Sequence, residues 1–253
     1  MHLFTEGETR LNSAYGFNFL YAERLTPALV QGAVAGWPCA PGVGWPSWAF
    51  ENHDAPRAIS RWVASEQRDA FARMKMLLLL TLRGNAFLYY GEELGLTQVE
   101  IGFEHLQDPE AIANWPLTLS RDGARTPMPW RSDAAQLGFT TGRPWLPLGP
   151  DHGALAVDRQ SADAESLLNL TRRLIAFRHA HPALMEGDIA ILHADAQLLV
   201  FRREVEGQAL LCAFNMGDTP AALPIALQKG SVLQAVNGAT VEQLPPFGGI
   251  VLG

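Results

Sequence analysis

The chain has 253 residues, of which 48% are hydrophobic and 18% are charged, a composition typical of a globular protein with a sizeable core. The formal net charge is −7 and no run is rich in Lys or Arg, which argues against a nucleic-acid partner. No apolar run approaches the roughly 20 residues of a membrane span, and no basic region followed by an apolar one opens the sequence, so we expect no membrane contact and a cytoplasmic location.

Strands alternate with helices over the first two-thirds of the sequence. Pro27 suits a first helical turn, Gly84 suits a helix C-terminus, and Pro182 stops the last helix. In chain order we expect a strand at 12–20, a helix at 26–35, a Pro- and Gly-rich loop at 41–46 and a buried strand at 48–51. A helix at 69–83, which contains the apolar run 74–80, and a strand at 86–90 should follow. After them we expect a long loop at 115–143 and an amphipathic helix at 163–180. This alternation predicts a parallel sheet with helical crossovers.

The pattern changes after Pro182, where short apolar or alternating runs are separated by turn residues. We expect strands at 189–193, 197–203, 208–215, 232–236 and 249–252. These strands predict a small all-β domain at the end of the chain.

Three strand–helix units do not close a (β/α)8 barrel, which needs eight. An open three-stranded parallel sheet would leave unpaired strand edges. From the pattern alone, the first part of the chain is either a small, unusual α/β layer or a piece of something larger.

Two polar clusters can carry chemistry. His53 and Asp54 follow the predicted strand at 48–51, and parallel barrels build their active sites at the carboxyl ends of strands. A carboxylate beside an imidazole can grip vicinal hydroxyls, although an Asp there can also simply cap the next helix. Arg121 and Arg125 put two guanidinium groups on one loop, which suits forked hydrogen bonds to carboxylates or hydroxyls but also fits a solvated charge cluster.

Other chemical patterns are weak. Two glutamates in the segment 91–95 follow another predicted strand and are either catalytic or helix N-terminal charges. Cys39 and Cys212 are too few for a disulfide framework, and no Cys/His cluster has zinc spacing. No glycine pattern resembles a phosphate loop or a dinucleotide fingerprint. We therefore expect no metal and no cofactor.

Three segments together resemble one known family. Residues 50–62 (FENHDAPRAISRW) resemble the last short signature of α-amylase-family barrels, in the form used by α-glucosidases and oligo-1,6-glucosidases. Residues 88–95 (LYYGEELG) look like the signature on that family's eighth barrel strand, and residues 121–130 (RDGARTPMPW) are similar to a stretch nearly diagnostic of the same subgroup. The order and spacing are those of the family. The chain therefore resembles the C-terminal part of an α-glucosidase of the α-amylase superfamily, glycoside hydrolase family 13.

The resemblance implies a retaining mechanism, in which an Asp attacks the anomeric carbon, a Glu protonates the leaving oxygen and a second Asp steadies the distorted sugar. Asp54 matches the second Asp, the transition-state stabiliser, and His53 matches its partner on the hydroxyls of the same sugar. Arg121 matches an Arg that pairs with an acidic residue at the floor of the glucose pocket. Arg125 matches an Arg near the pocket entrance.

The resemblance also implies an α/β fold that is the last third of a (β/α)8 TIM barrel, at about residues 1–180, followed by an all-β sandwich domain at about 185–253. In the family, the nucleophile and the acid/base precede the strand at 12–20, so we expect neither in this chain. Glu6 and Glu8 match acidic residues just beyond the true acid and are not expected to replace it. The expected partner is a polypeptide with the missing N-terminal half of the barrel, without which the chain should be inactive.

The expected function is exo-acting hydrolysis of α-glucosides by a complete enzyme of which this chain is a part. The expected substrates are α-linked gluco-oligosaccharides or a sucrose-like disaccharide. A second hypothesis is a non-catalytic amylase-like binding protein, as in the heavy subunits of amino-acid transporters. A third is glucosyl transfer or sucrose isomerisation, which the same residues can serve. The sequence leaves the linkage and the choice between hydrolysis and transfer open.

Overall fold

The structure is a computed structural model, and its described residues form two compact units. Glu6 and Glu8 lie outside the described residues. The expected boundary at 180–185 falls within the first unit and stays a prediction. The described residues are 2–5, 7, 9–39, 44–118 and 120–253; the first unit consists of 1–49, 69–87 and 173–253, and the second of 50–68 and 88–172.

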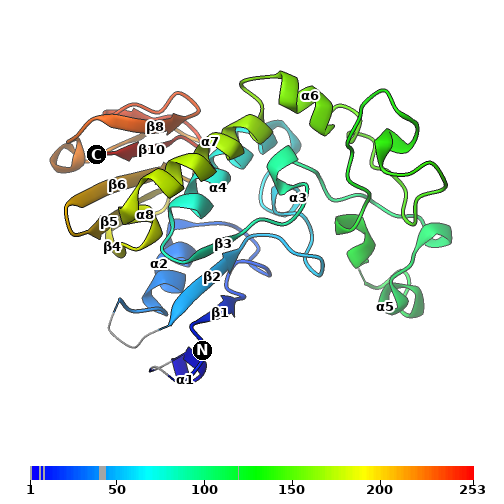
Figure 1. Cartoon of the computed structure of the whole chain (residues 1–253), viewed down its shortest axis with the longest axis horizontal. Helices are drawn as coiled ribbons and strands as arrows, with labels where there is room; N and C mark the ends of the chain where they lie inside the picture. Colours follow the sequence, from blue (N-terminus) through cyan, green and yellow to red (C-terminus); the bar gives the residue numbers. More distant parts are fainter. Residues whose placement is uncertain (1, 6, 8, 40–43, 119) are drawn as a thin grey trace. The chain divides into compact units, whose positions relative to one another are not determined.

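A three-stranded parallel sheet in the first unit confirms the predicted parallel arrangement (Figure 1). Its order is β1 (Ser13–Gly16), β2 (Trp45–Ala49) and β3 (Asn85–Phe87). The first and third strands end earlier than predicted, since the chain turns directly after β1 and leaves the sheet after β3. The central strand begins earlier and takes in Pro46, which shortens the expected loop; residues 41–43 of that loop lie outside the described ones. Among the described residues, β1 and β3 each have one strand neighbour, so each keeps one unpaired edge.

The helices next to these strands follow the predicted signals. α2 (Pro27–Ala35) begins after Thr26, whose Oγ1 accepts a hydrogen bond from the backbone N–H of Leu29 at 3.2 Å. α4 (Arg68–Thr81) buries the whole apolar run 74–80, as predicted. The helix ends three residues before Gly84, which has a φ of +130°. A Cβ at Gly84 would lie 2.6 Å from a backbone oxygen of β2, so glycine is needed for the close passage into β3.

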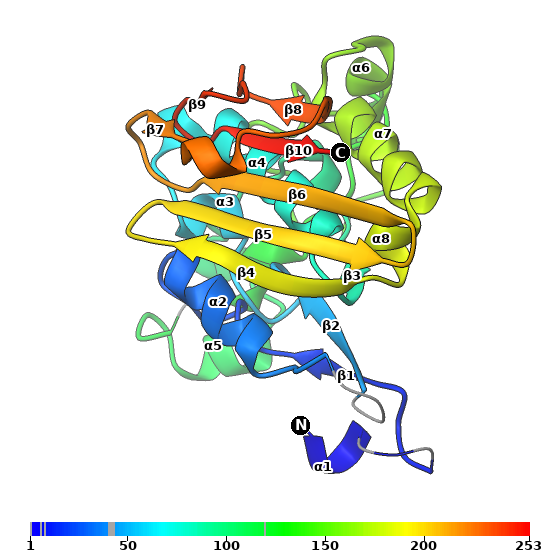
Figure 2. The same cartoon turned by 90° about the vertical axis from the view of Figure 1, so that its left-hand side faces the viewer.

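The C-terminal part of the first unit is a β-sandwich (Figure 2). All five predicted strands form one antiparallel sheet, with the order β4 (Asp188–Ala194), β5 (Leu198–Val205), β6 (Gln208–Asn215), β10 (Gly249–Leu252) and β8 (Val232–Val236). A pair of two-residue strands that the sequence pattern missed, β7 (Ala221–Ala222) and β9 (Gln243–Leu244), forms a second small sheet. Buried side chains of both sheets form one apolar core.

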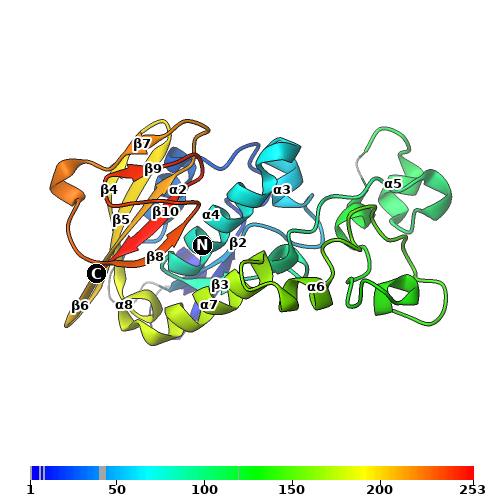
Figure 3. The same cartoon turned by 90° about the horizontal axis from the view of Figure 1, so that it is seen from above.

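The second unit is mostly irregular, as the predicted long loop indicated (Figure 3). Its helices are short: α3 (Ala58–Arg61), α5 (Pro109–Ala113), α6 (Val157–Ala162) and single 3-10 turns, among them η4 (Arg121–Ala124) and η5 (Ala135–Gly138). The remaining helices of the chain are α1 (His2–Thr5), α7 (Leu167–Ala180) and α8 (Pro182–Met185). No helix of the described residues is both long and apolar enough to cross a membrane.

The predicted helix at 163–180 begins four residues late. Asp163 closes α6 instead, and its Oδ1 accepts a hydrogen bond from the backbone N–H of Glu165 at 2.9 Å. Ser166 then takes the capping position of α7, where its Oγ accepts from the backbone N–H of Asn169 at 3.2 Å. Asp163 and Glu165 therefore belong to the turn before α7.

Candidate active site

His53 and Asp54 lie in a tight turn a few residues after β2. The Oδ1 atom of Asn52 accepts hydrogen bonds from the backbone N–H groups of Asp54 and Ala55, both at 2.9 Å, which fixes the backbone of the turn. His53 Nε2 lies 3.3 Å from Asp54 Oδ2. The Asp54 side chain is 38% exposed and that of His53 is 65% exposed, so both can reach a ligand.

Both arginines of the predicted cluster reach the same carboxylate. Arg125 Nη2 donates to Asp54 Oδ1 at 2.9 Å, and its Nε donates to the backbone oxygen of His53 at 2.8 Å. Arg121 Nη1 lies 3.5 Å from the same Oδ1 atom. The structure thus brings together all four residues that the sequence singled out. Two guanidinium groups therefore lie against one oxygen of Asp54.

Asp108 is a partner of the site that the sequence analysis missed. It is buried, and it accepts hydrogen bonds from Arg121 Nε at 2.8 Å, from Arg121 Nη2 and from the backbone N–H of Arg121 at 3.1 Å. These bonds hold the pKa of Asp108 well below its usual range and raise the pKa of Arg121. Arg121 therefore bridges two carboxylates, one buried and one exposed. The sequence signal that could have drawn attention to Asp108 is the following Pro109, since an Asp before a Pro is typical of a helix N-terminus.

The loop that carries both arginines is held by its own polar groups. Asp122 is buried, and its Oδ2 accepts from the backbone N–H groups of Gln107 at 2.6 Å and Asp108 at 2.9 Å. A Cβ at Gly123 would lie 2.2 Å from the backbone oxygen of Val99. Only glycine therefore fits at position 123, because any side chain would collide with the backbone of Val99. The two arginines thus extend from a fixed backbone.

A buried ion pair supports the site. Arg57 Nη1 donates to Glu51 Oε2 at 3.1 Å, and both side chains are almost fully buried. The same guanidinium donates to the backbone oxygens of Tyr90 at 2.7 Å and Ala124 at 3.0 Å, and lies 4.6 Å from the ring centre of Tyr89. Arg57 thereby ties the start of the Asp54 turn to Ala124, the residue directly before Arg125.

The two glutamates of segment 91–95 differ in their contacts. Glu92 is buried, and its Oε2 accepts from the backbone N–H of Tyr89 at 3.2 Å, which fits the helix-terminus hypothesis. Glu93 lines a cavity instead, and burial raises the pKa of its carboxyl group. No group of three or more His, Cys, Asp or Glu side chains in the described part of the chain could hold a metal ion.

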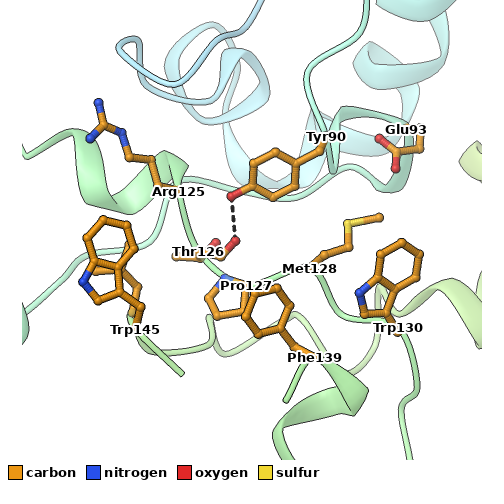
Figure 4. Close-up of a pocket in the computed structure, with 10 residues that line it drawn as sticks. Tyr90, Glu93, Arg125, Thr126, Pro127, Met128, Trp130, Phe139 and Trp145 are labelled. Carbon is orange, nitrogen blue, oxygen red and sulfur yellow. Dashed lines mark hydrogen bonds between the residues drawn. The ribbon is translucent and has the colours of Figure 1, made fainter. Parts of the chain in front are cut away.

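A cavity of about 460 Å³ lies beside Arg125 (Figure 4). We call it the aromatic pocket. Its lining includes the aromatic residues Tyr90, Trp130, Phe139 and Trp145 and two charged residues, Glu93 and Arg125. Because Arg125 also binds Asp54, the aromatic pocket adjoins the carboxylate site.

Comparison with known proteins shows the class of the protein. The chain matches the family "Alpha amylase, catalytic domain" over residues 29–187 and the family "Domain of unknown function (DUF3459)" over residues 186–250. The first match covers more than half of the sequence, so the chain belongs to the α-amylase family. The fold is the last part of a (β/α)8 barrel followed by an all-β domain, as the sequence resemblance implied.

Relatives from the predicted subgroup match the chain. The chain is 40% identical over 227 residues to the probable alpha-glucosidase of Rhizobium meliloti (strain 1021), covering 89% of this chain and 41% of that protein. It is 34% identical over 198 residues to the probable oligo-1,6-glucosidase 2 of Bacillus subtilis (strain 168), covering 70% and 35%. The crystal structure of the alpha-glucosyl transfer enzyme XgtA superposes with a TM-score of 0.85 at 41% identity, covering 96% and 46%. The predicted resemblance is confirmed, and the chain spans less than half the length of each of these relatives.

Proposed function

We propose that this chain supplies one side of the active site of an exo-acting, retaining enzyme that cleaves α-glucosides. The observation that carries the proposal is a partly exposed carboxylate, Asp54, aligned by two arginines and a histidine. Its relatives named as an alpha-glucosidase and an oligo-1,6-glucosidase support the same class of substrate, an α-linked gluco-oligosaccharide or a sucrose-like disaccharide.

Asp54 acts in the transition state. When the bond to the leaving group breaks, positive charge develops on the sugar ring, and an ionised carboxylate at its hydroxyls gains interaction energy at that moment. Arg125 and Arg121 orient the Asp54 carboxylate, and Asn52 fixes its backbone. His53 holds an adjacent hydroxyl of the same sugar, as donor or acceptor.

The nucleophile and the acid/base come from outside this sequence. The open edges of β1 and β3 support this, because a barrel would cover both with further strands. The partner is therefore the first part of a barrel, either in a longer chain or as a separate polypeptide. We place the enzyme in the cytoplasm, since Cys39 is an exposed free thiol.

A second candidate function is glucosyl transfer. The similarity to the alpha-glucosyl transfer enzyme XgtA supports it, and the residues of the Asp54 site serve either outcome. The outcome is hydrolysis if water reaches the glucosyl group first, and glucosyl transfer if a second hydroxyl compound does.

The test is Asp54→Asn in the protein expressed from the longest reading frame that contains this chain. We expect kcat for an α-glucoside to fall about 10²- to 10³-fold, with a much smaller change in KM, because a transition-state contact acts on kcat. Asp69→Asn is the matched control, since Asp69 is exposed and pairs with Arg73 on its own helix. An unchanged kcat in the Asp54 variant would remove the proposed role of Asp54, whereas no turnover by the wild type would favour a binding protein.

A further inference from the structure

The contact between Asp54 and Arg125 joins two segments that lie 71 residues apart in the chain. Neither segment is part of a strand or a long helix, since Asp54 lies in a turn and Arg125 directly follows the 3-10 turn η4. A carboxylate that acts in a transition state needs an accurate position, because a shift of about 1 Å can cost about 100-fold in rate. Side chains from elsewhere must therefore hold the two segments together.

Two tyrosine hydroxyls hold the backbone on either side of Arg125. The Tyr89 hydroxyl donates to the backbone oxygen of Ala124 at 3.2 Å, and the Tyr90 hydroxyl donates to that of Thr126 at 2.7 Å (Figure 4). Burial raises the pKa of both hydroxyls above the ordinary value of 10, so both keep the proton that they donate. The peptide groups before and after Arg125 are thus both anchored.

Arg57 connects the same backbone to the turn that carries Asp54. Its Nη2 atom donates to the backbone oxygen of Ala124 at 3.0 Å, whereas Nη1 donates to that of Tyr90 at 2.7 Å and to Glu51 Oε2 at 3.1 Å. Glu51 and Arg57 lie three residues before and after Asp54, so their ion pair closes the base of the turn. One guanidinium therefore joins the Asp54 turn to Ala124 and to the segment after β3.

The burial of Arg57 does not maximise stability. Arg57 is fully buried, yet its Nε atom has no hydrogen-bond partner among the described residues. A buried ion pair offsets the cost of leaving water only when its donors are well satisfied, and apolar side chains of similar size often stabilise a fold as well or better. Arg178 of the first unit, by contrast, donates to backbone oxygens of one short stretch, residues 80–84. The donors of Arg57 go to three segments, an arrangement that fixes relative positions.

We propose that Arg57 and Tyr89 are positioning residues for the reaction at Asp54. Through the backbone oxygen of Ala124 they hold Arg125 at the distance from which it orients the Asp54 carboxylate. The inference rests on the proposed function, since it requires Asp54 to act in the transition state. Neither residue has to touch the sugar, because both act through the backbone.

The first test uses Arg57→Lys and Tyr89→Phe in the protein expressed from the longest reading frame that contains this chain. Lysine keeps the charge beside Glu51 but lacks the forked donors that reach two backbone oxygens. Phenylalanine removes only the hydroxyl group. We expect kcat for an α-glucoside to fall about ten- to thirtyfold in Arg57→Lys and about three- to fivefold in Tyr89→Phe, because the transition-state contact is misplaced. KM should change less than about twofold.

Combination with Asp54→Asn shows whether the two residues act through Asp54. If they position this carboxylate, neither Arg57→Lys nor Tyr89→Phe should lower kcat by more than about twofold further once Asp54 is replaced. A residue that only stabilises the fold lowers activity by the same factor in both backgrounds. Equal factors in both backgrounds, or a wild-type kcat in both single variants, would overturn the proposal.

Arg178→Lys and Thr81→Val are the matched controls. Arg178 is buried and donates to backbone oxygens, as Arg57 does, and the hydroxyl of Thr81 is a buried donor to backbone oxygens, as that of Tyr89 is. Both controls should lower the melting temperature, while kcat per folded molecule stays within about twofold of the wild type. A loss of kcat in Arg178→Lys as large as that in Arg57→Lys would show that kcat reports stability alone and would also overturn the proposal.

Hydrogen–deuterium exchange separates this proposal from the proposed function. Arg57→Lys should speed amide exchange at residues 52–55 and 122–126, because both segments lose an anchor, whereas Arg178→Lys should leave both unchanged. If Asp54→Asn keeps the wild-type kcat while exchange rises in both segments of Arg57→Lys, the role of Asp54 fails but the hold of Arg57 on the two segments stands. Unchanged exchange at 122–126 in both Arg57→Lys and Tyr89→Phe would overturn the positioning role, whatever the kinetics.

Discussion

Arginine side chains have different partners in the two units of the molecule. In the first unit, Arg203 is fully buried, and its described partners are all backbone oxygens, including those of Thr81 at 2.6 Å and Gly187 at 2.8 Å. Arg178 likewise donates to backbone oxygens at and beyond the end of α4. In the second unit, Arg121 and Arg125 are partly exposed and share the carboxylate of Asp54.

The difference separates a structural cation from a site cation. The last carbonyl groups of a helix have no partner within the helix, and a buried guanidinium with five donors can satisfy several of them. Most of the hydrogen-bonding capacity of Arg203 is then used by the backbone. An arginine on an exposed carboxylate keeps solvent access, so a ligand can enter the same network.

The largest expected effect is on the free energy of unfolding, through the buried Arg203. Arg203→Met should lower the free energy of unfolding by about 3 kcal/mol or more, because several buried carbonyl groups lose their donor. Arg202→Met is the control, since neighbouring Arg202 is half exposed and pairs with exposed Glu204; its effect should stay within about 0.5 kcal/mol. Urea denaturation of both variants measures this, and equal losses would contradict the structural role of Arg203.

Acid should destabilise the second unit through His152, which is not part of the Asp54 site. Burial lowers the pKa of His152 to about 4, from 6.5. The unfolded chain binds a proton near pH 6.5 and the folded chain only near pH 4, so stability falls as the pH drops through this window, by about 3 kcal/mol in total.

The test of the His152 prediction is a series of urea titrations from pH 7.5 to about pH 4. His152→Gln should flatten the pH dependence between 6.5 and 4. The low pKa of Asp108 adds a further loss of stability only below about pH 4, where an ordinary Asp becomes protonated, so the two contributions separate on the pH axis. The same slope in wild type and variant would exclude His152 as its source.

The exposed side of the comparison is probed by Arg121→Ala in the longest reading frame. We expect KM for an α-glucoside to rise about tenfold, since a charge-assisted contact to the sugar site is lost and Asp54 loses a partner. Some stability is lost as well, because Asp108 stays buried without its cation. Arg131→Ala is the control, as Arg131 and its partner Asp133 are both exposed. A wild-type KM for Arg121→Ala would place Arg121 with the structural arginines.

The smallest expected effect concerns the turn below the aromatic pocket. Gln136→Gly should raise the free energy of unfolding by up to about 1 kcal/mol, because glycine adopts a φ of 50° without strain, although the more flexible unfolded chain offsets part of the gain. Thermal melts of wild type and variant measure the change. Gly142→Ala on the same loop is a reference, since Gly142 has no positive φ and a Cβ there meets only a side-chain oxygen at 3.9 Å. A clear loss of stability in Gln136→Gly would mean that the Gln136 side chain outweighs the strain.

The sequence by itself determined the local elements and the family. The apolar run in α4 and the apolar or alternating strands β6, β8 and β10 were predicted within one or two residues, because burial selects short apolar or periodic runs bounded by turn residues. The three signature segments identified the family, since their residue order is itself the signal. Two-residue strands such as β7 and β9 carry no such pattern and were missed.

The tertiary structure decided how the site residues are paired. Asp54 meets Arg121 and Arg125 across 67 and 71 residues of chain, and no local pattern states which carboxylate an arginine will reach. The sequence predicts Asp108 as a helix N-cap, and the structure has it there. Its second role, as the buried carboxylate partner of Arg121, depends on the loop that brings Arg121 next to it. The aromatic pocket likewise depends on tertiary contacts, since the carbonyl oxygen of Leu137 accepts a hydrogen bond from the backbone N–H of Trp130, which lines it. Hydrophobic periodicity predicts which residues of a segment are buried. Which side chains pair with one another depends on how the loops bring distant segments together.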